Sequence, residues 1–129
     1  MPQLPTPESA GHRPTLLVDD QAAFRQLARS LLEGRYGIVV VGEASSGEEA
    51  LEMVPLLHPK VVILDVQLPG MNGFEAAWRM MEMAPELQVV VVSAYDFQYT
   101  ALAESVGAAG FVSKRHLSAE GVARLLGIQ

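Results

Sequence analysis

Short apolar runs recur along the chain and are separated by longer amphipathic stretches. Four of these runs are rich in Val, Ile or Leu with little polar alternation, and the last run is short. Strands that are buried on both faces, as in a parallel sheet, have this pattern. We therefore predict five strands, at Thr15–Val18, Ile38–Val41, Val61–Leu64, Val89–Val92 and Phe111–Val112.

The stretches between the runs have helical periodicity. Phe24, Leu27, Ala28 and Leu31 follow the i, i+3, i+4, i+7 spacing of an amphipathic helix. Each later stretch contains a polar residue able to cap the amino end of a helix. These N-cap candidates are Ser46, Asn72, Asp96 and Ser118.

Two residues inside these helices carry specific expectations. Pro55 has no amide hydrogen and clashes with the preceding turn, so we expect it to end or kink the second helix. Trp78 shares the apolar positions of the third helix with Phe74, Ala77 and Met81, and we expect it to pack against the sheet.

A strand followed by a helix, repeated five times, predicts the α/β class. Right-handed crossovers then place the helices on both faces of a parallel sheet, in three layers. Residues 1–13 are rich in Pro and polar residues and have no periodicity, which predicts a disordered leader. Residues 14–129 are expected to form one domain.

The composition excludes several classes of function. The chain has no Cys, so disulfides and thiolate chemistry are absent, as in many cytoplasmic proteins. The net charge of −6 argues against nucleic-acid binding by this chain alone. No apolar run is long enough to span a membrane, and no signal peptide is recognised. We expect a cytoplasmic protein.

Chemically active side chains follow several of the predicted strands. Because all carboxyl ends of a parallel sheet lie at one edge, these residues are expected to converge there. Taken singly, an Asp or Ser at a strand end is as often a turn residue, and a lone Lys is usually solvated. The candidates at this edge are Asp19, Asp20, Asp65, Ser93 and Lys114.

Three carboxylates close together repel one another, and a hard divalent cation relieves this repulsion. Magnesium takes oxygen ligands and keeps several waters, so it suits such a site. An aspartate can serve as a covalent acceptor of phosphoryl groups, with a nearby ammonium balancing charge. The cluster therefore indicates phosphoryl chemistry at a metal-binding edge.

The same residues resemble the receiver domain of bacterial two-component response regulators. The resemblance extends over nearly the whole chain and implies a flavodoxin-like (βα)5 sandwich with strand order 2-1-3-4-5. The segment from Asp65 to Gly73 is its most specific part. The matching motifs are Leu17–Asp20, Val61–Gly73, Val92–Ala94 and Gly110–Lys114.

The resemblance implies a role for each residue of the cluster. Asp65 would accept a phosphoryl group from a sensor histidine kinase or a phosphotransfer protein. Asp20 and Asp65 would bind Mg2+ or Mn2+ directly, and Asp19 would bind it mainly through water. The backbone carbonyl of Gln67 would complete the protein ligands, and Lys114 would bind the phosphoryl group.

The resemblance also implies a switch. The Ser93 hydroxyl would move towards the phosphoryl group, and Phe111 would turn inward. This would reshape the face formed by the fourth helix, the fifth strand and the fifth helix, a surface through which such domains form homodimers. Phe111 lacks the hydroxyl of the Tyr that is commoner at this position.

Some segments of the chain point to one subclass of the family, and a few positions differ from the usual family residues. Residues 19–25 and 108–111 look like the subclass that precedes a helix-turn-helix DNA-binding domain, which would make the output transcriptional. Arg115 follows the lysine where the family usually has Pro. Gln67 and Tyr95 occupy two positions that tune hydrolysis of the phosphoryl group, and the bulky Tyr95 is expected to slow it.

Two other functions compete with this interpretation. A phosphatase with an aspartyl intermediate, as in the haloacid-dehalogenase-like family, needs a second acid two residues after the nucleophile, and that residue here is Gln67. A receiver-like module that binds partners without phosphorylation is the other alternative. It would fail to bind magnesium or accept phosphate. We expect a regulatory phosphoacceptor that catalyses its own phosphorylation and dephosphorylation rather than an enzyme.

Overall fold

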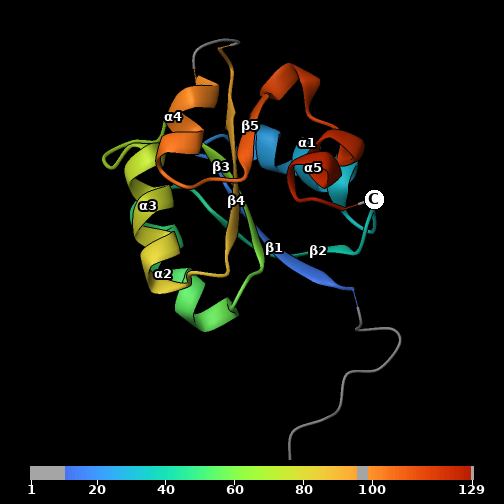
Figure 1. Ribbon diagram of the computed structural model, residues 1–129, viewed down its shortest axis with the longest axis horizontal. Helices are drawn as coiled ribbons and strands as arrows, with labels where there is room; N and C mark the ends of the chain where they lie inside the picture. The colour runs from blue at the N-terminus through green and yellow to red at the C-terminus, as the bar shows by residue number, and fades with distance from the viewer. Residues whose placement is uncertain (1–10, 96–98, 129) are drawn as a thin grey trace, which may run out of the picture.

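A computed structural model of the chain describes residues 11–95 and 99–128. In these residues strands and helices alternate (Figure 1). The strands are β1 (Arg13–Val18), β2 (Ile38–Ala44), β3 (Val61–Asp65), β4 (Gln88–Ser93) and β5 (Gly110–Ser113). The α-helices are α1 (Ala22–Leu32), α2 (Gly47–Leu57), α3 (Gly73–Met83), α4 (Tyr99–Ser105) and α5 (Ala119–Leu125), and a 3-10 turn, η1 (Lys114–His116), precedes α5.

The five strands form one parallel sheet in the order β2-β1-β3-β4-β5. This order confirms the predicted flavodoxin-like fold. All five strands are longer than their predicted apolar runs, because backbone pairing continues into the neighbouring residues. Asp65 pairs with Val92, and Ser93 pairs with Ser113, so both polar residues belong to the sheet.

Helices cover both faces of the sheet, as predicted. In Figure 1, α2, α3 and α4 lie on the left of the sheet, and α1 and α5 lie on the right. One core therefore contains buried residues of α2, α3 and α4, such as Val54, Met80 and Ala103. The other contains residues of α1 and α5, such as Leu32 and Val122. Two separate cores hold the strands rigidly between them.

Three of the predicted N-caps are confirmed. Ser46 Oγ accepts a hydrogen bond from Glu49 N at 3.1 Å, and Asn72 Oδ1 accepts one from Glu75 N at 3.0 Å. Ser118 Oγ accepts one from Gly121 N at 3.0 Å. These bonds satisfy amides that the first turn of a helix leaves without partners. The fourth candidate, Asp96, lies outside the described residues.

Pro55 was expected to end or kink the second helix; the first alternative is wrong, and the kink stays a prediction. Helix α2 continues through Pro55 to Leu57, and His58 caps it in a left-handed conformation with φ of 49°. Proline removes only one amide donor near the end of the helix, so little is lost before the chain turns. The His58 amide still donates to Val54 O at 3.0 Å and closes the last turn.

The expectation for Trp78 is also wrong. The buried stripe of α3 runs through Ala76, Ala77 and Met80, whereas the Trp78 side chain is 51% exposed. One residue advances about 100° around a helix, so Trp78 falls at the margin of that stripe. Apolarity marked the residue as a core candidate, but its angular position decided its exposure.

The amino-terminal boundary lies close to its predicted place. Strand β1 begins at Arg13, whose amide donates to Gly37 O at 2.7 Å. Residues 1–10 of the predicted leader lie outside the described residues, so the disordered state of that segment stays a prediction. Among the described helices, none combines the length and hydrophobicity needed to cross a membrane.

Candidate functional site

Three carboxylates converge at the carboxyl edge of the sheet. Asp19 and Asp20 directly follow β1, and Asp65 is the last residue of the adjacent β3. One carboxylate oxygen from each lies within 4.8 Å of the others. Asp19 and Asp65 are buried, whereas Asp20 is exposed. The predicted acidic cluster therefore forms, with one member facing solvent.

The Asp19 carboxylate divides its oxygens between two contacts. Oδ1 accepts a hydrogen bond from the Gln21 amide at 2.8 Å, which fixes the turn into α1. Oδ2 lies 2.6 Å from Lys114 Nζ as an ion pair. That contact lacks hydrogen-bond geometry, so within the described residues Oδ2 is a buried oxygen without a hydrogen-bond donor.

The neighbours of Asp65 have opposite effects on the pKa of its carboxyl group. Burial raises the pKa of its carboxyl above the ordinary value, and the nearby Asp19 charge adds to this. The Gln67 amide, which donates to Oδ1 at 3.1 Å, and Lys114, 3.3 Å from Oδ2, act in the opposite direction. The net effect is a raised pKa, because burial outweighs the two donors.

Lys114 reaches the acidic cluster from the end of the edge strand β5. It follows β5 at the start of η1, and its side chain is 13% exposed. Its ammonium contacts both Asp19 and Asp65, as the strand-end argument predicts. The ammonium also lies 4.5 Å from the centre of the Phe24 ring. Helical spacing marked Phe24 only as a core residue, so its place at the site was missed.

Ser93 ends β4, and its side chain is fully buried. Its Oγ accepts a hydrogen bond from the Tyr95 amide at 3.0 Å. Its neighbour in the sheet, Ser113, has a buried hydroxyl with no hydrogen-bond partner in the described part of the chain. The hydroxyl of Ser93 is therefore held by one local bond at the predicted edge.

The remaining predicted residues surround this edge. The Gln67 side chain is exposed, and that of Tyr95 is 57% exposed. Phe111 is half-buried in β5, with its ring 5.7 Å from that of Tyr99 between centroids. Tyr99 in turn contacts the Phe74 ring at 5.7 Å. Phe111 thus belongs to an aromatic row that links β5, α4 and α3.

The acidic cluster suits a hard divalent cation. It offers oxygen ligands, and its three carboxylates outnumber the Lys114 ammonium. Among the residues that the structure describes, Asp19 Oδ2 also has no hydrogen-bond donor. Carboxylate oxygens on a strand edge, with one ligand open to water, match the preference of magnesium. Asp19, Asp20 and Asp65 could together hold such an ion.

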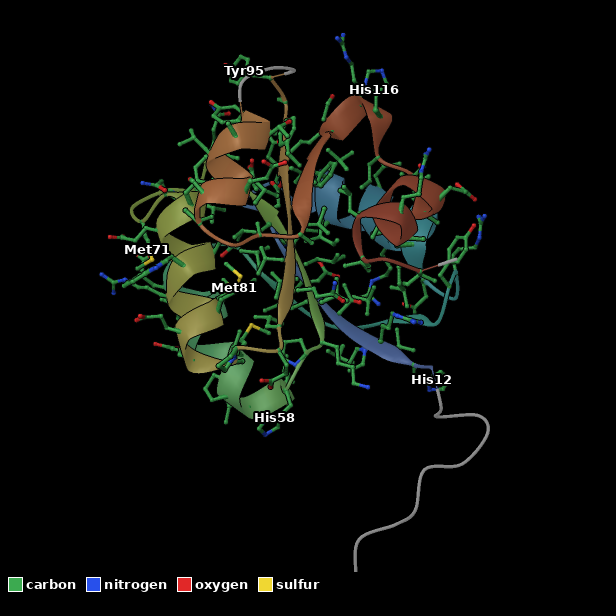
Figure 2. All side chains as sticks on the ribbon, viewed as in Figure 1. His12, His58, Met71, Met81, Tyr95 and His116 are labelled. Atoms are coloured by element: carbon green, nitrogen blue, oxygen red, sulfur yellow. The ribbon has the colours of Figure 1, made fainter. Side chains whose placement is uncertain are left out.

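The three histidines do not take part in this site. His12, His58 and His116 are exposed and lie in separate parts of the molecule (Figure 2).

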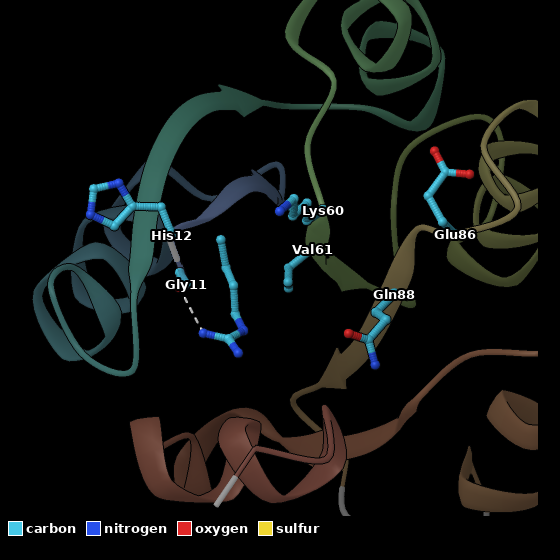
Figure 3. A pocket seen from close by; sticks show the side chains of 7 residues that line it. Gly11, His12, Lys60, Val61, Glu86 and Gln88 are labelled. Carbon is cyan, nitrogen blue, oxygen red and sulfur yellow. Dashed lines mark hydrogen bonds between the residues drawn. The ribbon is translucent and has the colours of Figure 1, made fainter. Parts of the chain in front are cut away.

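A pocket elsewhere, at the amino ends of β1, β3 and β4, is lined by charges of both signs, including Lys60 and Glu86 (Figure 3). Arg13 beside it is bound to the carbonyls of Gly11 and Tyr36, both at 2.8 Å. This pocket therefore lies at the other end of the strands from the acidic cluster and differs from it in charge.

Comparison with known proteins agrees with this geometry. The family model of the response regulator receiver domain matches residues 15–125. The response regulator GacA of Pseudomonas syringae pv. syringae is 37% identical over 100 residues, which are 77% of this chain and 47% of that protein. Protein-glutamate methylesterase/protein-glutamine glutaminase 3 of Hahella chejuensis is 40% identical over 98 residues, 76% of this chain and 28% of that protein.

A solved structure extends the comparison to three dimensions. The signal receiver domain of the response regulator NarL from Mycobacterium tuberculosis superposes with a TM-score of 0.79 and 32% sequence identity. The match covers 90% of this chain and 94% of that one. The chain spans less than half the length of the curated relatives described above. By its sequence, its fold and its acidic edge, the chain belongs to the family of response regulator receiver domains.

Proposed function

We propose that this receiver domain is a signalling switch that accepts a phosphoryl group on Asp65. One observation carries the assignment: the buried Asp65 carboxylate lies beside two further carboxylates and 3.3 Å from the Lys114 ammonium. Asp20 is exposed and therefore lies at the solvent side of the cluster, where a phosphodonor would approach. Asp65 combines a nucleophilic oxygen with nearby positive charge.

The transfer is a substitution at phosphorus. A carboxylate oxygen of Asp65 forms a bond to phosphorus while the bond from phosphorus to the donor breaks. With a histidine kinase or phosphotransfer protein as donor, the imidazole nitrogen keeps the electron pair of that bond. Lys114 then binds an oxygen of the transferred group and balances its charge. Hydrolysis of the aspartyl phosphate returns Asp65 to a carboxylate and releases phosphate.

Mg2+ or Mn2+ supplies charge neutralisation for the phosphoryl oxygens when it is bound. Asp20 and Asp65 are proposed as direct ligands, with Asp19 acting mainly through water and the Gln67 carbonyl completing the set. The orphaned Oδ2 of Asp19 supports this assignment. The protein has no separate substrate in this scheme, since the group enters and leaves its own Asp65.

The switch is proposed to act through Ser93 and Phe111. The Ser93 hydroxyl accepts a hydrogen bond from the Tyr95 amide and leaves it to reach the phosphoryl group. The space that it vacates admits the Phe111 ring, which now contacts Tyr99 in α4. The face formed by α4, β5 and α5 thereby changes and controls an output domain, a partner or a homodimer. Transcriptional output is proposed because residues 19–25 and 108–111 resemble the subclass of receivers that precedes a helix-turn-helix DNA-binding domain.

The test is intact-protein mass after incubation with acetyl phosphate and Mg2+. The wild type is expected to gain one phosphoryl group, and Asp65→Asn is expected to gain none. Asn preserves shape and removes the nucleophilic charge, and circular dichroism checks that it folds. A chelator in place of Mg2+ should suppress the gain in the wild type.

Two outcomes would count against the proposal. Equal phosphorylation of the wild type and of Asp65→Asn would place the acceptor elsewhere. The absence of an adduct in the folded wild type, with acetyl phosphate and with a phosphorylated kinase as donor, would favour the phosphorylation-independent module.

A further inference from the structure

The ammonium of Lys114 is enclosed on two sides. Asp19 Oδ2 at 2.6 Å and Asp65 Oδ2 at 3.3 Å lie on one side, and the face of Phe24 lies 4.5 Å away. Only 13% of the lysine side chain is exposed. A lysine has four rotatable bonds along its stem, so an ammonium held in one place needs contacts that exclude its other rotamers.

The backbone around Phe24 is held in place by hydrogen bonds to Asp19. The Gln21 amide donates to Asp19 Oδ1 at 2.8 Å, and Arg25 Nη1 donates to the Asp19 carbonyl at 2.6 Å. These two bonds join both sides of the first turn of α1 to the end of β1. Phe24 lies between the two donors in sequence and packs against the core shared by α1 and α5. The ring therefore has little freedom to leave Lys114.

An aromatic ring attracts the Lys114 ammonium without accepting a hydrogen bond from it, which aliphatic or polar side chains at this position would not do. It attracts a cation electrostatically, and the attraction is greater where water is excluded. It accepts no conventional hydrogen bond, so the ammonium keeps its N–H groups for carboxylate or phosphoryl oxygens. An aliphatic side chain would exclude water without attracting the charge, and a polar one would compete for the N–H groups.

We propose that Phe24 is a positioning residue that holds the Lys114 ammonium over Asp65 for phosphoryl transfer. The proposal rests on the assignment of Asp65 as phosphoacceptor. When the P–O bond of acetyl phosphate breaks, acetate leaves with the electron pair and the new bond forms to an Asp65 oxygen. Lys114 then turns from the carboxylate to an oxygen of the transferred group while its ammonium stays on the Phe24 face.

The experiment compares rates of phosphoryl gain from acetyl phosphate and Mg2+, measured by intact mass on the full chain. Phe24→Leu is expected to slow the rate about fivefold, in line with the loss of a partly desolvated cation–π contact. Phe24→Tyr keeps an aromatic face and is expected to stay within about twofold of the wild type. Rescue by Tyr separates an aromatic requirement from simple filling of space.

Leu31→Ala is the matched control. Leu31 also lies on α1 and packs partly buried in the same core, but nothing places it at Lys114. Loosening α1 in this way should leave the rate within about twofold of the wild type, even though stability falls. A structural role of Phe24 alone would instead make Leu31→Ala and Phe24→Leu equally slow.

Nuclear magnetic resonance of the Lys114 ε-methylene protons provides a second measurement, independent of phosphorylation. The Phe24 ring current should shift these protons in the wild type and in Phe24→Tyr, and the shift should vanish in Phe24→Leu. A wild type that gains no phosphoryl group would refute the proposed function, and the resonance shift would still test the contact. A phosphorylated wild type with an equally fast Phe24→Leu variant would refute the positioning role alone.

Discussion

At the scale of single residues, Asp65 must be buried and must also carry a charge. Burial raises its pKa, which opposes ionisation but also makes the ionised oxygen a stronger nucleophile. The Gln67 amide and Lys114 counteract part of this cost by binding the two carboxylate oxygens separately. The pKa of Asp65 is thus set by opposed neighbours rather than by the carboxyl group alone.

Tyr95 provides a prediction about the lifetime of the phosphoryl group. Its backbone amide donates to Ser93 Oγ, which places Tyr95 at the rim of the site. A bulky ring at this rim should hinder attacking water, although its 57% exposure limits the shielding. Tyr95→Ala is therefore expected to speed the loss of phosphate by about twofold or more.

The measurement is the decay of the phosphorylated mass after removal of acetyl phosphate. Leu56→Ala is a suitable control, because Leu56 is 78% exposed on α2 and remote from the acidic cluster. The same decay rate in Tyr95→Ala and in the wild type would show that the ring does not shield the aspartyl phosphate.

At the scale of elements, the site depends on how closely α3 and α1 approach the strand ends. A Cβ on Gly73, the first residue of α3, would lie 2.2 Å from the Asp65 carbonyl oxygen. That contact is shorter than real Cβ atoms show, so only glycine lets α3 begin beside Asp65. The Gly73 amide also donates to Val66 O at 2.8 Å and fixes this turn.

Helix α1 is tied to β2 by Glu43. Its two carboxylate oxygens bind Arg25 and Arg29, each at 2.8 Å. Hydrogen bonds from Arg29 and then Arg25 lower the pKa of Glu43. Because the folded pKa lies below the unfolded one, this carboxylate stabilises the fold above the unfolded pKa and loses that contribution as pH falls through the folded pKa.

Glu43→Gln is accordingly expected to lower the free energy of unfolding at pH 7 by no more than about 1 kcal/mol, since the side chains are partly exposed. The difference between wild type and variant should shrink as the pH falls from the ordinary pKa of a glutamate through the lower pKa of folded Glu43, because the wild-type carboxylate then becomes protonated. Urea unfolding at several pH values measures the free energy of unfolding of wild type and variant at pH 7 and its change with pH. Glu75→Gln serves as the control, because it removes an exposed ion pair with Arg79 and should change the free energy of unfolding little at any pH. A Glu43→Gln difference that did not vary with pH would contradict the ion-pair explanation.

At the scale of the whole molecule, the acidic cluster exists only in the folded chain. Asp19 and Asp20 directly follow β1, and Asp65 ends β3, more than forty residues later in the sequence. An ion that binds all three should therefore stabilise the folded state over the unfolded one. The expected gain is about 1.4 kcal/mol at ten times the dissociation constant.

Thermal unfolding in a chelator and in rising MgCl2 tests this expectation, with NaCl of equal ionic strength as the control for screening. Asp20→Asn removes one exposed ligand, so it should weaken the response to Mg2+. In the chelator this variant should be slightly more stable than the wild type, because it removes a like charge from the cluster. A magnesium response that Asp20→Asn left unchanged would argue against Asp20 as a ligand.

Much of the fold followed from local chemistry. Apolar runs without alternation predicted the parallel strands, and Ser46, Asn72 and Ser118 began their helices as expected. The convergence of Asp19, Asp20, Asp65, Ser93 and Lys114 at one edge also followed, since parallel strands place all their carboxyl ends together. These features depend on periodicity and topology, which the order of residues specifies.

Other features depend on angles and distances between elements. Whether Trp78 was buried, how closely Gly73 approached Asp65 and which ring met Lys114 were decided only when the helices packed on the sheet. The raised pKa of Asp65 likewise arises from burial that no local pattern measures. By itself the sequence determined the fold, the family resemblance and the convergence of the reactive side chains. Only the tertiary structure decided their environments, because burial and contacts between distant residues depend on how separate elements pack together.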